Sequence, residues 1–189
     1  MIASIALLML GVPMLIVAAL IALLDPGPAL FRQQRVGLDG RRFILLKFRT
    51  MYHRPGGWTK LEQATEHDRR VTWIGAMLRR TSFDEVPQLI NVLRGEMSIV
   101  GPRPHAPGTC AGGIPFEQVT SRYAIRHCVK PGITGLAQVR GWRGETDTVE
   151  KLLHRLECDL EYIAHRNLWS DLWIICLTVA AVARMRNAY

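Results

Sequence analysis

Residues 1–24 read MIASIALLMLGVPMLIVAALIALL and carry no charge, so all 24 basic and 16 acidic side chains of the 189-residue chain lie beyond them. As a straight helix this stretch would be about 36 Å long, enough to cross a bilayer. No second apolar run of that length exists, which excludes a multi-span channel or carrier. The sequence therefore predicts a membrane helix over 1–24 and one domain over 25–189, large enough to bury its own core.

The middle of this apolar stretch holds Gly11 and Pro13. Proline has no N–H, so the carbonyl of Met9 loses its helical partner, which is costly in lipid unless another group satisfies it. Two interpretations follow from the residues alone. In one, a kinked helix spans the bilayer. In the other, a re-entrant helix enters, bends at a hinge at Pro13 and leaves on the same side.

The chain that leaves the apolar stretch is strongly basic. Residues 25–54 hold seven basic side chains against Asp25 and Asp39, and the whole chain has a net charge of +8. This bias predicts that the domain lies on the cytoplasmic side and is held against phospholipid headgroups. Nucleic acid is not an expected partner, because no aromatic side chains are interleaved with the basic ones and no binding module is present.

Two strands are predicted next, over 29–36 and 42–50, with a turn at 37–40 that makes them a hairpin. Alternation places Lys47 and Arg49 on one face of the second strand, and Ile44, Leu46 and Phe48 on the other. Residues 53–68 are polar and are expected to form a loop.

Helical patterns follow over 73–80, 81–95, 145–165 and 172–183. The last is uncharged but too short to span a bilayer, so we expect it to lie on the membrane surface, with Trp169 and Trp173 as interfacial anchors. The predicted fold class is α+β and mostly helical: a membrane protein with an N-terminal apolar helix, a small β-hairpin and surface amphipathic helices.

The pattern over 81–95 is the clearest of these helices, with Val86, Leu89, Ile90 and Leu93 at helical spacing. Proline is tolerated only in the first turn of a helix, so Pro87 places the helix start just before it. Ser82 or Asp84 is then the expected N-cap, and residues 82–85 also fit a capping box.

Asp84 and Glu85 fall in this first turn, where acids often serve only to cap a helix. Their surroundings suggest more, because Arg79, Arg103 and the hairpin's Lys47 and Arg49 can approach them. A helix N-terminus ringed by cations suits phosphate. An acid there can hold Mg²⁺ that bridges to phosphate oxygens, a role we assign to Asp84, or act as a nucleophile that the cations keep ionised.

Three long motifs then carry a resemblance. Residues 47–51 (KFRTM), 79–104 (RRTSFDEVPQLINVLRGEMSIVGPRP) and 130–139 (KPGITGLAQV) resemble the bacterial sugar transferases called monotopic phosphoglycosyl transferases. The resemblance runs from the apolar helix to Asp159, Tyr162 and Asp171. Members often have a basic segment before the apolar helix, whereas this sequence opens with Met1, so further chain upstream is an expectation.

The resemblance implies a fold, an activity and a set of site residues. The family transfers a sugar-1-phosphate from a UDP-sugar to a polyprenyl phosphate, usually undecaprenyl phosphate, with Mg²⁺ and release of UMP. Asp84 and Glu85 match its catalytic pair, and the aspartate forms a covalent phosphosugar intermediate. Pro13 matches the hinge of its re-entrant helix. Arg79 and Arg103 match phosphate or nucleotide contacts, and Lys47 lies in a motif near the active site.

The resemblance also implies a place in the cell: the cytoplasmic face of the bacterial inner membrane, at the first membrane step of exopolysaccharide, capsule or O-antigen-type assembly. Residues 141–147 (GWRGETD) resemble the branch that commonly uses UDP-glucose or UDP-galactose. A polar turn in which Thr146 or Asp147 caps the next helix explains the same residues. The alternative function is a non-catalytic membrane scaffold of a glycan assembly complex.

One basic stretch has no acidic residue within it, and it contains Arg122, Arg126, Lys130, Arg140 and Arg143. We expect contact with lipid headgroups or a diphosphate there, with Arg140 among the substrate-binding residues; a solvated basic face is the alternative. A second copy of the chain, in a homo-oligomer, is a further candidate partner.

Overall fold

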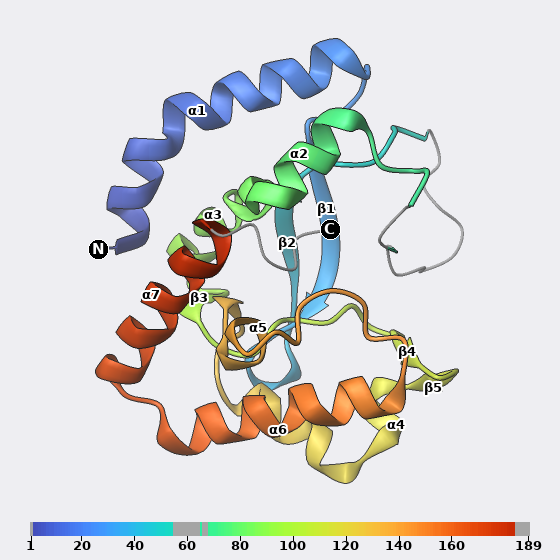
Figure 1. Cartoon of the computed structure of the whole chain (residues 1–189), viewed down its shortest axis with the longest axis vertical. Helices are drawn as coiled ribbons and strands as arrows, with labels where there is room; N and C mark the ends of the chain where they lie inside the picture. The colour runs from blue at the N-terminus through green and yellow to red at the C-terminus, as the bar shows by residue number, and fades with distance from the viewer. Residues whose placement is uncertain (1, 55–64, 66–67, 184–189) are drawn as a thin grey trace.

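The computed structural model describes residues 2–54, 65 and 68–183. It is an α+β fold, mostly helical, with an apolar N-terminal helix, as predicted (Figure 1). The predicted loop over 53–68 lies largely outside the described residues. In chain order the elements are α1 (Ile2–Leu24), β1 (Leu30–Val36), η1 (Leu38–Gly40), β2 (Arg42–Phe48), α2 (Trp73–Thr81), η2 (Phe83–Glu85), α3 (Gln88–Leu93), β3 (Ser98–Val100), β4 (Cys110–Ala111), β5 (Ile114–Pro115), α4 (Phe116–Val119), η3 (Ser121–Cys128), β6 (Gly132–Thr134), α5 (Leu136–Val139), α6 (Val149–His165) and α7 (Leu168–Ala183).

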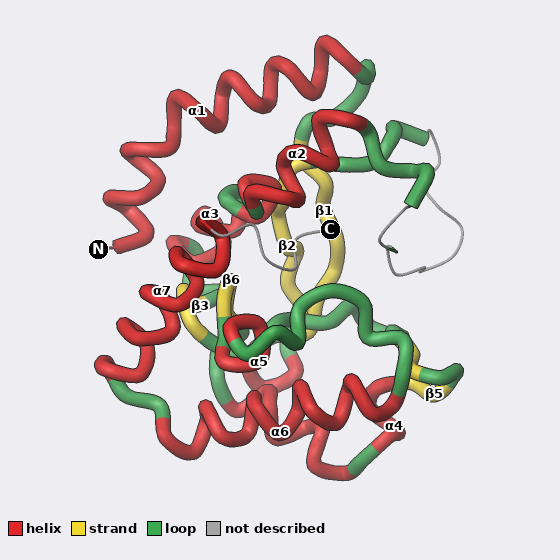
Figure 2. Tube along the Cα trace, viewed as in Figure 1, coloured by secondary structure: helices red, strands yellow, loops and turns green. Residues whose placement is uncertain are grey.

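The predicted hairpin is confirmed: β1 and β2 pair antiparallel, with Leu30 opposite Phe48 and Val36 opposite Arg42. Two further small sheets, β4–β5 and the parallel pair β3–β6, have no counterpart in the prediction (Figure 2). The other edge of β2 is covered by α3. Asn91, which has no exposed surface, accepts a hydrogen bond from Leu46 N at 3.0 Å and donates one to Ile44 O at 2.7 Å.

The apolar helix α1 is continuous through Pro13, and Figure 1 shows that its axis changes direction along its first half. One stripe of α1 packs on the domain. Ala3 near one end and Ile21 near the other are buried, whereas outward residues such as Leu8 and Leu15 are 85% and 71% exposed. Ile21 joins a core cluster with Phe48 of β2 and α2 side chains. Both ends of α1 therefore stay close to the domain, and its outer surface remains apolar.

The predicted helix over 81–95 is wrong in its first half. Ser82 adopts a left-handed conformation with φ 57° and ends α2, because its N–H returns to the carbonyls of Arg79 and Leu78. A 3₁₀ turn, η2, follows, and α3 begins only after Pro87, which stands at its N-cap position. Ser82 holds the N-cap position of η2 but makes no side-chain capping hydrogen bond, and Asp84 lies inside that turn, so neither caps the long helix that the sequence suggested.

The last two helices agree better with prediction. Helix α6 begins at Val149, and its N-cap is Thr148, whose side chain accepts from Lys151 N; this corrects Thr146 and Asp147. Helix α7 begins four residues earlier than expected, at Leu168. Its exposed side includes Trp169 and Trp173, which are 79% and 53% exposed, and their role as interfacial anchors stays a prediction.

The contact between α2 and the end of β2 gives a test of this packing. A Cβ built on Gly75 would lie 2.0 Å from the carbonyl oxygen of Thr50, whereas a Cβ on Gly11 meets nothing within 4 Å. We expect G75A to push α2 off the strand and lower the free energy of unfolding by about 2–3 kcal/mol. The matched control G11A should not lower it. Thermal unfolding of both variants in detergent measures this, and equal midpoints for G75A and wild type would contradict the packing.

Candidate active site

The tight turn η2 places two consecutive acids, Asp84 and Glu85, inside the domain, where they are 5% and 8% exposed. The turn is fixed from both sides. Left-handed Ser82 precedes it and accepts a hydrogen bond on Oγ from Arg143 Nη2 at 2.5 Å. Pro87 follows it. Because successive residues of such a turn point in different directions, the two carboxylates have different neighbours.

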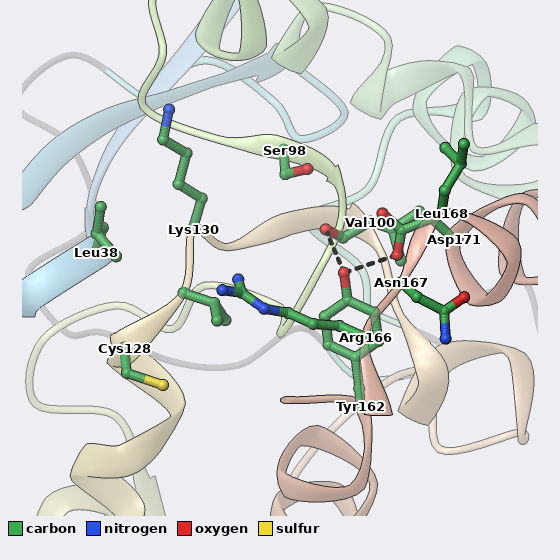
Figure 3. Close-up of a pocket in the computed structure, with 11 residues that line it drawn as sticks. Leu38, Ser98, Val100, Cys128, Lys130, Tyr162, Arg166, Asn167, Leu168 and Asp171 are labelled. Atoms are coloured by element: carbon green, nitrogen blue, oxygen red, sulfur yellow. Dashed lines mark hydrogen bonds between the residues drawn. The ribbon is translucent and has the colours of Figure 1, made fainter. Parts of the chain in front are cut away.

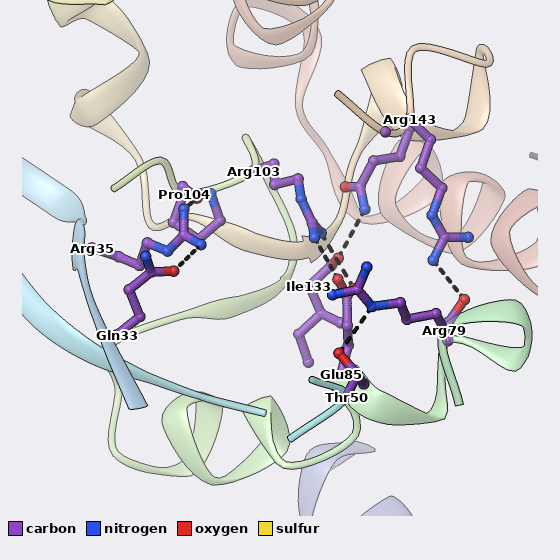
Figure 4. A network of polar contacts seen from close by, with 12 residues as sticks. Gln33, Arg35, Thr50, Arg79, Glu85, Arg103, Pro104, Ile133 and Arg143 are labelled. Atoms are coloured by element: carbon purple, nitrogen blue, oxygen red, sulfur yellow. Dashed lines mark hydrogen bonds and ion pairs between the residues drawn. The ribbon is translucent and has the colours of Figure 1, made fainter. Parts of the chain in front are cut away.

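Both acids line a cavity of about 700 Å³, which we call the Asp84 cleft. Its walls come from the β1–β2 hairpin, η2 and the segments 103–106 and 143–146. The charged residues of its wall that act on the acids include Lys47, Arg79, Arg103 and Arg143. In Figure 4 the guanidinium groups of Arg79 and Arg103 project from different segments toward the turn that carries Glu85.

Glu85 is bound by Arg103 through both carboxylate oxygens, one at 3.2 Å and the other in a shorter contact. Burial alone would raise the pKa of Glu85, but the charge and hydrogen bonds of Arg103 outweigh burial and lower that pKa to about 2. Glu85 is therefore a permanent anion that holds Arg103 in place.

Asp84 differs from its neighbour in having no such partner: within the described residues its carboxylate accepts no hydrogen bond. Burial, and after it the negative charge of Glu85, raise the pKa of Asp84 to about 6. Lys47, Arg103 and Arg79 act in the opposite direction, so Asp84 is still mostly ionised at neutral pH. A buried, ionised and uncommitted carboxylate that faces a cleft is suited to attack an electrophile or to bind a cation.

The other predicted site residues are only partly brought together. Lys47 reaches the acids from β2, and burial lowers its pKa while both carboxylates oppose that shift. Arg79 lies in the wall, with Nε 2.9 Å from Thr50 Oγ1. Arg49 also lines the cleft, but its Nη1 pairs with Asp25 at 3.0 Å at the end of α1.

Arg140 is not among the residues that line the Asp84 cleft. It pairs with Glu161 on the surface, where both side chains are more than 40% exposed. Arg143, three residues further on, is the member of that basic stretch that enters the cleft and touches Ser82. The sequence contained a signal for it, since Arg143 lies within the 141–147 motif.

A buried network behind Arg103 was not predicted. The Arg126 guanidinium pairs with Asp159 at 2.7 Å and donates to the backbone carbonyl of Arg103 at 2.8 Å. It also contacts His105, whose pKa burial lowers well below its usual value, so this histidine is neutral. Arg126 and Asp159 thus fix the segment from which Arg103 reaches Glu85.

The residues of the cleft fit Mg²⁺ in one arrangement. Within the described ranges no group of three or more His, Cys, Asp and Glu residues could enclose an ion. Mg²⁺ is often held by one or two carboxylates, with waters and substrate phosphates as the other ligands. Asp84 is free for that role, whereas Glu85 is engaged by Arg103. The donor set therefore fits an ion that arrives with a phosphate substrate.

Comparison with known proteins matches the chain to one family and to several sugar-phosphate transferases. The family model described as bacterial sugar transferase matches residues 1–185. The chain is 50% identical over 177 residues to the UDP-glucose:undecaprenyl-phosphate glucose-1-phosphate transferase of Escherichia coli K12, covering 94% of this chain and 37% of the relative. It is 46% identical over 176 residues to the exopolysaccharide production protein PSS of Rhizobium leguminosarum bv. phaseoli, covering 93% and 88%.

A third relative, from Xanthomonas campestris pv. campestris, carries the same description as the Escherichia coli protein and is 47% identical over 187 residues, covering 99% of this chain and 38% of the relative. The chain thus spans little more than a third of the length of the first and third relatives, and most of the length of the second.

The buried pair behind the site can be tested by substitution. R126M leaves Asp159 buried without its cation, and we expect a loss of about 3–5 kcal/mol in the free energy of unfolding. The double variant R126M/D159L removes both charges and should recover much of that loss. Thermal unfolding in detergent compares the three proteins. If R126M is as stable as wild type, Arg126 does not hold this segment.

Proposed function

The chain belongs to the bacterial sugar transferase family, and from that premise we propose that it transfers sugar-1-phosphate from a UDP-sugar to undecaprenyl phosphate. The products are undecaprenyl-diphosphate-sugar and UMP. The observation that carries the proposal is the unpaired, ionised Asp84 in a cleft ringed by Lys47, Arg79 and Arg103. Relatives described as glucose-1-phosphate transferases favour UDP-glucose as the donor over UDP-galactose.

In the proposed first step, a carboxylate oxygen of Asp84 attacks the donor phosphorus next to the sugar. The bond from that phosphorus to the bridging oxygen breaks, and the electron pair leaves with UMP. Asp84 then carries the sugar-1-phosphate as an acyl phosphate. In the second step, a phosphate oxygen of undecaprenyl phosphate attacks the same phosphorus and releases the Asp84 carboxylate.

In this scheme the cations of the cleft bind the diphosphate and balance negative charge. Arg79 and Arg103 approach the turn from different segments, so they can hold a diphosphate against Asp84 and stabilise negative charge on the leaving UMP. Lys47 counters the charge of both acids. Glu85 acts through Arg103, which it holds in position. Bound Mg²⁺, held by Asp84 and phosphate oxygens, would supply further charge neutralisation.

We further propose that the enzyme is monotopic and lies on the cytoplasmic face of the bacterial inner membrane, among phospholipids. The packing of α1 at both ends supports a re-entrant helix hinged at Pro13, since a spanning helix would carry one end away from the domain. Arg49 ties Asp25, at the end of α1, to the strand that enters the cleft. A long lipid acceptor could thus reach Asp84 at the membrane surface.

The covalent step predicts an adduct when the acceptor is omitted. Incubation with UDP-glucose and Mg²⁺ should give one equivalent of UMP and a hexose-phosphate on a peptide containing Asp84, seen by mass spectrometry. D84N should give neither, and the control R41Q, at an exposed position outside the cleft, should give both. UMP release across a panel of UDP-sugars should be fastest with UDP-glucose.

Two outcomes would oppose this scheme. Turnover with lipid present but no adduct without it would favour direct transfer, with Asp84 as a metal ligand only. Glycan assembly in cells that express D84N would favour the alternative, a non-catalytic scaffold of an assembly complex.

The re-entrant topology predicts that both ends of α1 are reached from the cytoplasmic side. Ser4 is exposed, and Ser4→Cys in a C110S/C128S/C176S background places one reactive thiol near the N-terminal end. A protein that keeps only the exposed Cys110 marks the domain's side. We expect a membrane-impermeant maleimide to label both proteins in inside-out vesicles and neither in intact spheroplasts. Opposite sidedness would establish a spanning helix.

A further inference from the structure

A second cavity, of about 650 Å³, lies where α6 meets α7, and we call it the Lys130 pocket. Its wall includes Lys130 from the segment before β6, Arg166 between the two helices, and Tyr162 and Asp171 (Figure 3). It shares no lining residue with the Asp84 cleft. It is therefore a separate site, for which the proposed reaction has no use.

Two cations in this pocket are uncommitted. Lys130 and Arg166 are exposed, and neither makes a hydrogen bond or ion pair within the part of the chain that the structure describes. In Figure 3 the Arg166 side chain points across the pocket toward the segment that carries Lys130. In Figure 3 the Lys130 side chain extends away from Arg166, so the two cations line the pocket from separate segments without meeting. An anion in the pocket would be attracted by both of them.

The acid in the pocket is already engaged. Asp171 accepts a hydrogen bond from the Tyr162 hydroxyl at 2.9 Å, and the same hydroxyl lies 3.3 Å from the Val100 carbonyl. The positive end of α7, which begins at Leu168 in the pocket wall, adds to the potential of the two cations. Two cations and one acid give the pocket a net charge of +1, which a phosphodiester monoanion would neutralise.

The position of the pocket indicates where this anion comes from. Leu168 belongs both to its wall and to an apolar stripe on α7 that includes Trp169, Leu172 and Trp173, which are 38–79% exposed. Tryptophans at such a boundary mark the headgroup level of a bilayer. In Figure 1, α7 and the first half of α1 lie along the same margin of the molecule. The cations thus stand beside a surface suited to lipid.

We propose that the Lys130 pocket binds the headgroup phosphate of an anionic phospholipid. Arg166 and Lys130 hold the phosphate from separate segments of the pocket wall, and the acyl chains run along the apolar stripe of α7. This site is distinct from the substrate cleft and does not depend on the proposed reaction. It would fix the orientation of the domain against the membrane through a contact additional to α1.

The test measures binding of short-chain dihexanoyl phosphatidylglycerol to the full chain in neutral detergent, by calorimetry below the micellar concentration of the lipid. We expect K130Q/R166Q to weaken binding at least tenfold, since two charge-assisted contacts are lost. K130R/R166K keeps the charges and should keep the affinity. R69Q/R80Q removes the same charge at exposed positions outside both cavities and outside the two basic segments expected to meet headgroups, and should bind as wild type does.

Further arms separate the sources of the anion. Dihexanoyl phosphatidylcholine and inorganic phosphate should each bind at least tenfold more weakly than the anionic lipid. Equal binding of either would overturn the proposal, as would unchanged affinity in K130Q/R166Q. R103Q should leave lipid affinity unchanged; if R103Q abolishes binding instead, the lipid occupies the Asp84 cleft and the proposal fails. Adduct formation on Asp84, measured separately, reports on the proposed reaction alone.

Discussion

The ion pair between Glu85 and Arg103 is the interaction on which the site depends. Two consecutive carboxylates in one buried turn would repel each other, and burial would favour their protonation. Arg103 binds Glu85 through both carboxylate oxygens and so keeps Glu85 ionised and hydrogen-bonded. The same arginine also lowers the pKa of Asp84. The guanidinium of Arg103 therefore makes Glu85 a structural anion and leaves Asp84 as an ionised group that faces the cleft.

This pair is held by contacts that extend through the domain in two directions. Behind it, Arg126 and Asp159 fix the carbonyl of Arg103, so α6 supports the site from one side. On the other side, Thr50 accepts a hydrogen bond from Arg79. Its neighbour in the chain, Arg49, forms an ion pair with Asp25 at the end of α1. A shift of α1 would therefore move Arg49 and the adjoining wall of the cleft.

The parts of the fold that were predicted are those with a local signal. Alternation and a turn located the β1–β2 hairpin, and uninterrupted apolarity located α1. The pairing of β3 with β6 had no such signal, because each strand is three residues long and they lie far apart in the chain. The prediction of a helix over 81–95 failed in its first half because Pro87 and the capping-box pattern at 82–85 placed the start too early, whereas left-handed Ser82 and a 3₁₀ turn separate α2 from α3. Serine as a residue type does not predict a left-handed conformation.

The candidate site shows the same division. Asp84, Glu85, Lys47, Arg79 and Arg103 could be found because they lie in long motifs, but their division of labour depends on distances that no motif contains. Arg140 and Arg143 are the clearest case. They lie three residues apart in one basic stretch, yet the chain turns between them at Gly141, whose φ is +93°. One arginine consequently pairs with Glu161 on the surface, and the other reaches Ser82 beside the acids. The net charge of +8 is therefore not one basic face: it divides among internal ion pairs, the Asp84 cleft and the cations without ion pairs beside α7 in the described part of the chain.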